Sequence, residues 1–464
     1  MRHSERLVGV RGDAGLLTLV AALVVGPVAA EPLSFAAALV RLESHPTLEA
    51  SQAQGRAATA VRDSARALRF PQVGLSGTYG RFSDPVELDL GELNAKIHEL
   101  NPAIPTIPNL VLQPESFGFA TATLAWPVFT GGRIDAAQRA GEAGIRVSHA
   151  QREATRDALL LDLVTRYHGA TIAARAAAVQ DSVVDSLREH LRHARTLENQ
   201  GQIAAVERMR AEVALAQAEA LQLQRRHVLA LARAGLANLL GTGQDVDPTT
   251  ILTQVPPPPV LATLQTTASQ THPLPQQLQA VTAQAEQGVR VARADYWPTI
   301  ALLGGYKIDS YQLPELIPEW TVGATLTWPL FDGGARSAKV AGARAKLIEA
   351  QALQREAADK VGLLVHERYL AQEDAGRRAE VAERTEALAS ESLRLQRVAF
   401  REGMGRSIDV VDAENALATA RLARLAADYD SAVAWAGLML AAGHRHEVER
   451  VFSHSGPEAE PDVE

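Results

Sequence analysis

The sequence predicts a mixed α and β fold in which a strand hairpin leads into a very long helix, and it predicts this unit twice. The first observation is a doubled motif: residues 126–132 read WPVFTGG and residues 328–334 read WPLFDGG. The second is that proline is missing from residues 128–247 and from residues 330–456. Because proline inside a helix removes a hydrogen bond and clashes with the preceding turn, such runs indicate long helices.

The third observation is that the two copies keep their register. Gly201 recurs as Gly403 at an offset of 202 residues, and positions upstream of the first strand recur at an offset of 227. The difference of 25 residues lies between the two strands of the first copy. We therefore expect two internal structural repeats, residues 31–255 and residues 256–443.

Residues 1–30 have the organisation of a secretory signal peptide. Arginines stand at positions 2, 6 and 11, a short apolar run covers residues 14–25, and Val28-Ala29-Ala30 is a small-residue cleavage site. The alternative is an N-terminal membrane anchor, but the apolar run is too short to span a bilayer. No later stretch approaches 18 apolar residues, so we expect no transmembrane helix in the mature chain.

The first repeat can be followed element by element. We expect a short helix at 33–42, a helix at 46–69, strands at 72–80 and 117–126 around a loop at 82–115, and helices at 132–200 and 203–240. The strand hairpin thus covers residues 72–127 and the long helices cover residues 132–240. Placed end to end, the helices of 24 and 38 residues nearly match the helix of 69 residues, which favours an antiparallel two-stranded coiled coil.

The second repeat follows a proline spacer, residues 256–259, which is expected to be stiff and extended. It should contain a helix at 274–296, strands at 299–309 and 320–328 within a hairpin at 299–329, and helices at 334–402 and 407–442 within the segment 334–442. Residues 444–464 form an acidic tail that we expect to be disordered.

Glycines mark both ends of the long helices. The expected strand-to-helix turns are Gly131 and Gly132 in the first repeat and Gly333 and Gly334 in the second. The expected breaks at the far helix tips are Gly201, Gly403 and Gly405.

The strands are long enough to cross a membrane. Each has about ten residues, the length that a tilted strand needs to span a bilayer. Four of the five tryptophans lie at strand ends, where an aromatic belt at the membrane interface would place them: Trp126, Trp297, Trp320 and Trp328. The alternative is a soluble hairpin with tryptophan in its core. Because an open sheet cannot span lipid and closure needs about eight strands, a chain with four must assemble from several copies.

Composition excludes several classes of function. A net charge of −8 without a basic block argues against nucleic-acid binding, and the absence of cysteine excludes disulfides and thiol catalysis. His444 and His446, and likewise His190 and His193, are too few to indicate a metal site, and the second pair is interpreted as exposed helix residues. The sequence shows no catalytic set and no cofactor motif, so we expect no enzyme.

Asp409 and Asp412 follow the second tip and lie three residues apart on one helical face. Their functional interpretation is a ring of carboxylates at the mouth of an assembled tube. The alternative is a solvated helix start, where acidic residues are favoured by exposed N–H groups. The first repeat has Glu207 and Arg210 at the matching positions, so only one tip could carry the ring.

These features resemble the TolC-type outer-membrane efflux proteins, the outer membrane factor family, over residues 33–443. The resemblance rests on the doubled strand–turn–helix unit, the two Trp-Pro motifs and the segment from Gly403 to Glu414. It implies a homotrimer in outer-membrane lipid, with a 12-stranded β-barrel continued by a tunnel of 12 helices in the periplasm. It also implies a periplasmic membrane-fusion adaptor and an inner-membrane transporter as partners.

The same resemblance aligns Asp409 and Asp412 with the family's aspartate pair at the tunnel entrance. The family's gate arginine has no clear counterpart, because Gly405 takes its place and Arg406 follows one residue later. The function expected is a passive export duct of a tripartite efflux or secretion system. The alternative is a structural periplasmic coiled-coil protein without transport, which would not need strands that end in tryptophan. The sequence names no cargo.

Overall fold

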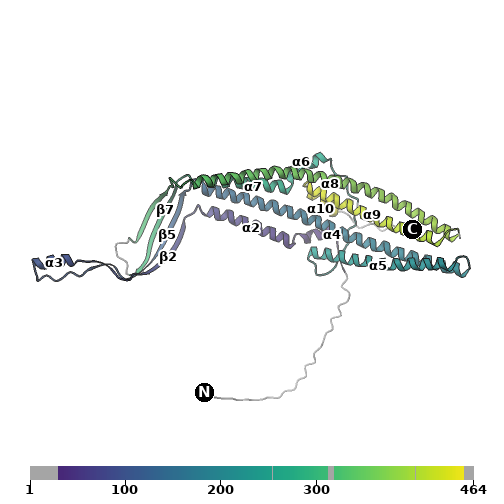
Figure 1. The fold of residues 1–464 in the computed structure, drawn as a ribbon, viewed down its shortest axis with the longest axis horizontal. Helices are drawn as coiled ribbons and strands as arrows, with labels where there is room; N and C mark the ends of the chain where they lie inside the picture. The colour runs from purple at the N-terminus through teal and green to yellow at the C-terminus, as the bar shows by residue number, and fades with distance from the viewer. Residues whose placement is uncertain (1–29, 253, 312–317, 403, 454–464) are drawn as a thin grey trace, which may run out of the picture.

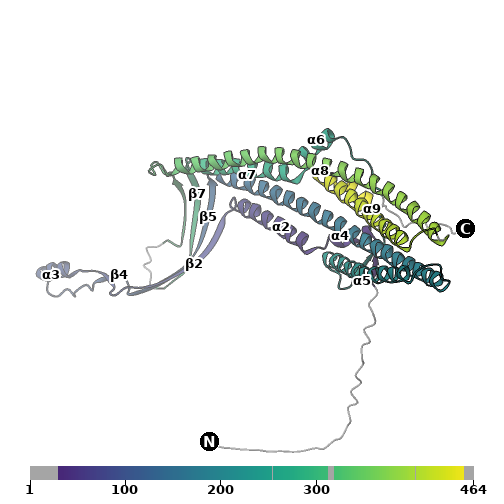
Figure 2. The ribbon, with the colours of Figure 1, turned by 45° about the vertical axis from the view of Figure 1, so that its right-hand side comes forward.

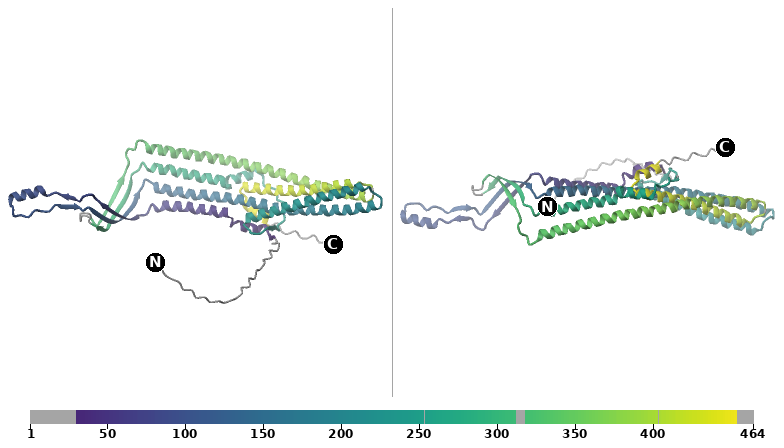
Figure 3. Two further views of the ribbon diagram at one scale, coloured as in Figure 1. Left: turned by 60° about the horizontal axis from the view of Figure 1, so that its bottom comes forward. Right: turned by 90° about the horizontal axis from the view of Figure 1, so that it is seen from above.

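The computed structural model describes residues 30–252, 254–311, 318–402 and 404–453. Almost all of the expected signal peptide, the tip residue Gly403 and the last residues of the expected tail lie outside the described residues. The molecule is elongated, with long helices running side by side away from one end of a sheet and a thin arm extending from the other end (Figures 1 and 3). No described helix combines the length and the apolar character that crossing a membrane requires.

Four strands form one antiparallel sheet in the order β2-β5-β7-β8. Their bounds are β2 (Gln72–Arg81), β5 (Ser116–Phe129), β7 (Thr299–Tyr311) and β8 (Trp320–Thr327). The two hairpins expected from sequence are therefore joined into one sheet by the pairing of β5 with β7. β2 and β8 are its outer strands, and neither has a second strand partner among the described residues.

The strand register gives the sheet two different faces. Directly paired residues lie on the same face, and side chains alternate along each strand. One face carries large exposed apolar side chains: Val73, Leu75, Tyr79, Leu124, Trp126, Leu302, Tyr306, Trp320, Val322 and Leu326. The opposite face is rich in hydroxyl groups: Ser76, Thr121, Thr123, Thr299, Thr321, Thr325 and Thr327. We call these the apolar face and the hydroxyl face.

Six helices make up the body below the sheet. Their bounds are α2 (Pro46–Ala67), α4 (Arg133–Asn199), α5 (Ala205–Leu240), α7 (Pro273–Ala294), α8 (Ala335–Arg401) and α9 (Ser407–Ala441). α2, α4, α7 and α8 pack in this order next to the sheet, whereas α5 packs on the far half of α4 and α9 packs on α8 and α4. Figure 2 shows α2 and α5 following one another along α4, as the helix lengths predict.

A belt of short elements surrounds the middle of the body. It contains β1 (Glu31–Leu33), which pairs in parallel with β6 (Val246–Pro248), and the helices α1 (Phe35–Leu42), α6 (Leu261–Thr271) and α10 (Arg445–Ser453). The largest hydrophobic core lies here, and its biggest buried side chains are Trp435, Tyr167, Phe35 and Phe452. The Tyr167 hydroxyl makes two hydrogen bonds: it donates to the carbonyl of Leu33 at 2.7 Å and accepts from the amide of Thr250 at 2.9 Å.

The expected disorder of residues 444–464 is wrong for Arg445–Ser453, which form α10. Val448 and Phe452 lie four residues apart on one helical face and are buried in the core. Arg445 pairs with Glu153 and Asp157 of α4. The helix itself has two arginines and two glutamates, so the acidic composition of the whole tail does not describe it, and the two buried apolar residues decide its fold.

The expected loop at 82–115 is also wrong, because it contains structure of its own. β3 (Val86–Leu88) pairs with β4 (Leu110–Gln113), and α3 (Gly91–Leu100) caps this hairpin, which forms the thin arm of Figure 1. Two hydrogen bonds between Asn94 and the backbone of Ile107, at 2.8 and 2.9 Å, fix α3 against the returning chain. Polar side chains thus order this proline-containing segment without a core.

Candidate functional site

The far ends of the helix pairs form two neighbouring tips. At the first tip, Gly201 has a left-handed φ of 72°, which favours glycine because a Cβ would be strained there. At the second tip, the backbone passes close to Gly405: a Cβ at this position would lie 3.0 Å from the backbone nitrogen of Phe400, a tight contact that favours glycine. The chain therefore turns back tightly at both ends.

Asp409 lies in the first turn of α9 and is held by Arg406. The Arg406 guanidinium donates to both carboxylate oxygens, at 2.8 and 3.1 Å, and the Arg406 backbone N–H donates to one of them at 3.2 Å. The hydrogen bonds from Arg406 hold the pKa of Asp409 below its usual value. Asp412 is exposed one turn further along α9. Arg406, which lies one residue after the position of the family's gate arginine, is thus the ion-pair partner of Asp409.

At the first tip, Glu207 and Arg210 occupy the positions that match Asp409 and Asp412. Glu207 connects the helix pair α4 and α5 to the helix pair α8 and α9. Glu207 accepts from Arg210 at 2.7 Å through one oxygen and from the backbone N–H of Ser407 at 3.2 Å through the other. The Ser407 hydroxyl is fully buried and lies 2.7 Å from Nε2 of His190. The tips are therefore joined by hydrogen bonds between residues about 200 positions apart, a contact that no local sequence pattern indicates.

The interpretation of His190 as an exposed helix residue is wrong. Its ring is partly buried, with its centroid 4.8 Å from that of Phe400, and burial lowers its pKa to about 4. His193, one turn along, is exposed as expected. Among the described residues, no group of three or more side chains is arranged to hold a metal ion.

At the other end of the long helices, two double-glycine turns link strand to helix. Gly131, Gly132, Gly333 and Gly334 all have left-handed φ values, of 61°, 83°, 63° and 92°. At Gly131 a Cβ would also approach the Trp297 side chain within 2.6 Å, so no larger residue fits. These turns allow α4 and α8 to start directly beneath the sheet.

The four tryptophans assigned to the membrane interface are all exposed. Three lie at the helix end of the sheet, where the indole N–H of Trp126 donates to Arg69 at 2.9 Å and that of Trp328 donates to Tyr296 at 3.1 Å. Trp320 lies at the other end of β8, paired with Tyr306. The fifth tryptophan, Trp435, is buried in the core of the belt.

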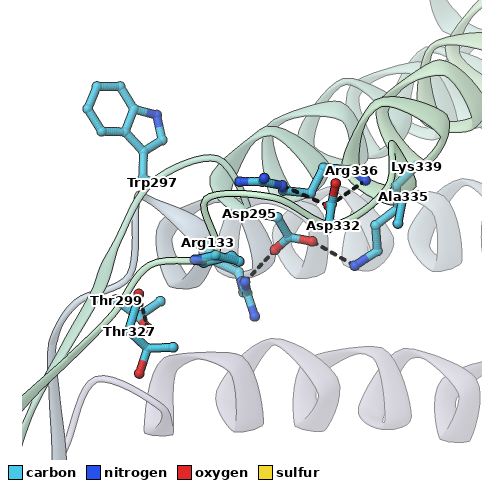
Figure 4. A pocket seen from close by; sticks show the side chains of 10 residues that line it. Arg133, Asp295, Trp297, Thr299, Thr327, Asp332, Ala335, Arg336 and Lys339 are labelled. Atoms are coloured by element: carbon cyan, nitrogen blue, oxygen red, sulfur yellow. Dashed lines mark hydrogen bonds and ion pairs between the residues drawn. The ribbon is translucent and has the colours of Figure 1, made fainter.

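A cluster of charged side chains lies beside these turns, where α4 and α8 begin and α7 ends (Figure 4). Asp295 pairs with Arg133 and, at 2.7 Å, with Lys339. Asp332 accepts from Arg336 at 2.8 Å and from two backbone N–H groups at the start of α8. We call these five side chains the junction cluster. It was not identified from the sequence, because its members are spread over 207 positions.

Comparison with known proteins agrees with this architecture. The model of the family described as outer membrane efflux protein matches residues 40–242 and 264–444. Protein CyaE of Bordetella pertussis (strain Tohama I) is 31% identical over 341 residues, which cover 70% of this chain and 65% of CyaE. The aligned stretch thus spans less than two thirds of the length of this relative.

Solved structures share the fold at lower identity. A membrane protein from Pseudomonas aeruginosa is 20% identical with a TM-score of 0.72, and the match covers 90% of this chain and 92% of that protein. The Campylobacter jejuni CmeC outer membrane channel is 15% identical with a TM-score of 0.71, and the match covers 90% of this chain and 88% of the channel.

Proposed function

From the premise that this chain belongs to the outer membrane efflux protein family, we propose that it is the outer-membrane channel of a tripartite efflux or secretion system. The resemblance to TolC-type proteins noted in the repeated motifs is confirmed by the family match over most of the chain. In this proposal the protein is a passive duct in the outer membrane with a periplasmic extension. Energy and cargo selection come from its partners.

The observation that carries this proposal is the two-faced sheet with two open edges. An apolar face with exposed tryptophan and tyrosine suits lipid, and a hydroxyl face suits a water-filled lumen. Because every backbone polar group in lipid needs a partner, β2 of one copy must pair with β8 of the next. Three copies close a barrel of 12 strands, as in the family resemblance.

Exposed apolar residues on the outer helices support the same assembly. On α5 they include Val213, Leu221 and Leu231, and on α8 they include Leu363, Leu370 and Leu388. α5 and α8 lie on opposite edges of the helix layer, as β2 and β8 do in the sheet. Packing α5 of one copy against α8 of the next would bury these side chains and continue the barrel as a helical tunnel.

The partners proposed at the periplasmic end are a membrane-fusion adaptor and, through it, an inner-membrane transporter. The tips are the part of the described structure most distant from the sheet, and they present Gln202 and Met404 to solvent. In the proposed orientation they are the turns nearest the inner membrane. Which adaptor, transporter and cargo the channel serves depends on the proteins that are made together with it in the cell.

The assembly is tested by the mass and conductance of the purified protein in detergent. Light scattering should give a protein mass about three times that of the mature chain, and reconstitution into planar bilayers should give discrete conductance steps. A folded monomer would exclude a closed barrel, since four strands cannot satisfy their own edges in lipid. A trimer that never conducts would favour the structural, non-transport alternative.

For Asp409 and Asp412 we propose the entrance ring. Three copies would bring six carboxylates around one axis, in excess over the three Arg406 guanidiniums that pair with Asp409. Charges closer than the Debye length of about 8–10 Å are incompletely screened. Replacing both residues with asparagine should move the cation-to-anion permeability ratio toward unity and remove block by multivalent cations added at the periplasmic side. Asparagine keeps the helix-start hydrogen bonding, so folding should be preserved.

The matched control is the double variant Glu380→Gln and Glu383→Gln. These two exposed acids are also three residues apart, on α8, away from the tips. Equal loss of selectivity in both double variants would mean that general charge, and not a ring at the entrance, determines selectivity. Unchanged selectivity in the Asp409 and Asp412 variant would leave the two aspartates as helix-start residues only.

A further inference from the structure

The junction cluster borders a cavity of about 530 Å³ where the sheet meets the helices. Three cations face two carboxylates in it, so the cluster carries one net positive charge. α4 and α8, each of 67 residues, begin beside it; the start of α4 has no side-chain cap, and Asp135 in its first turn is already paired with Arg69. The partial positive charge of a helix start adds to the local potential within the first turn. The cavity is therefore an electropositive site.

The three cations have different roles. Arg336 is mostly buried: it donates to Asp332 and to the carbonyl of Leu330, and its guanidinium lies 5.1 Å from the centre of the Tyr296 ring. Its contacts are those of a structural residue. The side chains of Arg133 and Lys339 are 48% and 66% exposed and share the single carboxylate of Asp295. Since one carboxylate cannot neutralise two cations, these two can accept a further anionic partner.

The register of the sheet indicates the side on which this cavity opens. Thr299 and Thr327 line the cavity and belong to the hydroxyl face. The ring of Trp297 points away from the charged side chains (Figure 4). In the proposed channel the hydroxyl face lines the lumen, so this step rests on the proposed function.

We propose that the junction cluster is a lumenal binding site for anionic groups (phosphate, sulfate or carboxylate groups) carried by cargo or dissolved ions. Three copies would form a positive collar where the barrel joins the tunnel. Its sign is opposite to that of the entrance aspartates, so the proposed duct would have two charged zones of opposite preference. Arg133 and Lys339 contact the anion, and Asp295 sets its affinity by competing for the same cations.

The test begins with equilibrium dialysis of the full-length protein in detergent against radiolabelled pyrophosphate. Lys339→Ala should weaken binding about fivefold, equivalent to roughly 1 kcal/mol, as for one exposed ion pair. Asp295→Asn should strengthen binding, because it removes the competing charge. The matched control is Lys360→Ala: this residue is also on α8, is 66% exposed and pairs with Glu356. Wild-type protein that binds no pyrophosphate, or equal weakening in both lysine variants, would overturn the site.

The lumenal position is tested by adding pyrophosphate at the barrel side of a planar bilayer, away from the entrance aspartates. Block that weakens in Lys339→Ala and strengthens in Asp295→Asn supports the collar. Binding without block of a conducting channel would place the site outside the lumen and overturn the proposal. Loss of pyrophosphate binding in anionic, but not zwitterionic, lipid nanodiscs would identify a lipid headgroup as the occupant instead. Absence of any conductance in a protein that binds pyrophosphate would contradict the proposed channel, not the anion site.

Discussion

Replacing Phe452 with alanine is expected to lower the free energy of unfolding of the helical body by about 3–5 kcal/mol, the usual cost of removing a fully buried aromatic side chain. Phe452 is 2% exposed, and its ring contacts those of Phe35, His168 and Trp435 at centroid distances of 5.7, 5.0 and 6.1 Å. These three residues come from α1, α4 and α9. One side chain of the C-terminal helix therefore connects three elements that the chain order keeps far apart.

The measurement is the loss of helical circular dichroism on heating or in denaturant. The matched control is Phe331→Ala, the same substitution at a side chain that is 90% exposed, and it should leave the helical transition unchanged. If Phe452→Ala behaves like this control, α10 does not belong to the core in solution, and the expectation of a disordered tail would apply after all. Deleting residues 445–464 should cost at least as much as Phe452→Ala, because the pairs of Arg445 with α4 are lost as well.

The long elements could be predicted because their signals are local and repeated. Proline-free runs and double glycines placed the starts and ends of α4 and α8 within two residues of the observed bounds. Both strand hairpins were also located, since large and small residues alternate in them. By contrast, β1, β6, α3, α6 and α10 are short, and a short helix has little stability of its own. Apart from α3, which is held by hydrogen bonds within its own segment, they form because of contacts with distant residues, and a single sequence contains no local sign of these contacts.

The candidate sites divide in the same way. The repeat symmetry predicted the turn glycines, and Asp409 and Asp412 were proposed from their spacing together with the family resemblance; the role of these two aspartates stays a prediction. The contact of His190 with Ser407 and the junction cluster were not predicted, because each combines ordinary residues from different helices. Trimer formation and barrel closure remain predictions, because a single chain leaves β2 and β8 with open edges. The internal repeats also remain a prediction.

His168 gives the second large expected effect, a loss of stability in acid. Burial lowers its pKa to about 4 from an ordinary 6.5. Its ring lies against Phe35, Tyr167 and Phe452, and neither ring nitrogen has a hydrogen-bond partner among the described residues. The cause is therefore desolvation of the imidazolium, since the rings around it carry no negative charge that would pair with it.

The sign follows from proton linkage. Between pH 6.5 and pH 4 the unfolded chain binds a proton at this residue and the folded chain does not, so stability falls as the pH falls through this window. A difference of 2.5 pKa units corresponds to about 3 kcal/mol at pH 4 relative to pH 7, and below pH 4 the loss from this residue is complete. His190, whose pKa is lowered to a similar value, should add a loss of the same sign at the tips.

The experiment compares the free energy of unfolding of wild type and His168→Phe from pH 7 to pH 4. Because carboxylates titrate in the same range, the informative quantity is the difference between the two curves. Phenylalanine cannot bind a proton and fits an aromatic cluster, so the variant should gain stability over wild type progressively as the pH falls. His227→Gln, at an exposed position of α5, is the matched control and should follow the wild-type curve. A constant difference between His168→Phe and wild type across the whole range would mean that His168 has the same pKa in the folded and the unfolded chain, and so is not desolvated in the core.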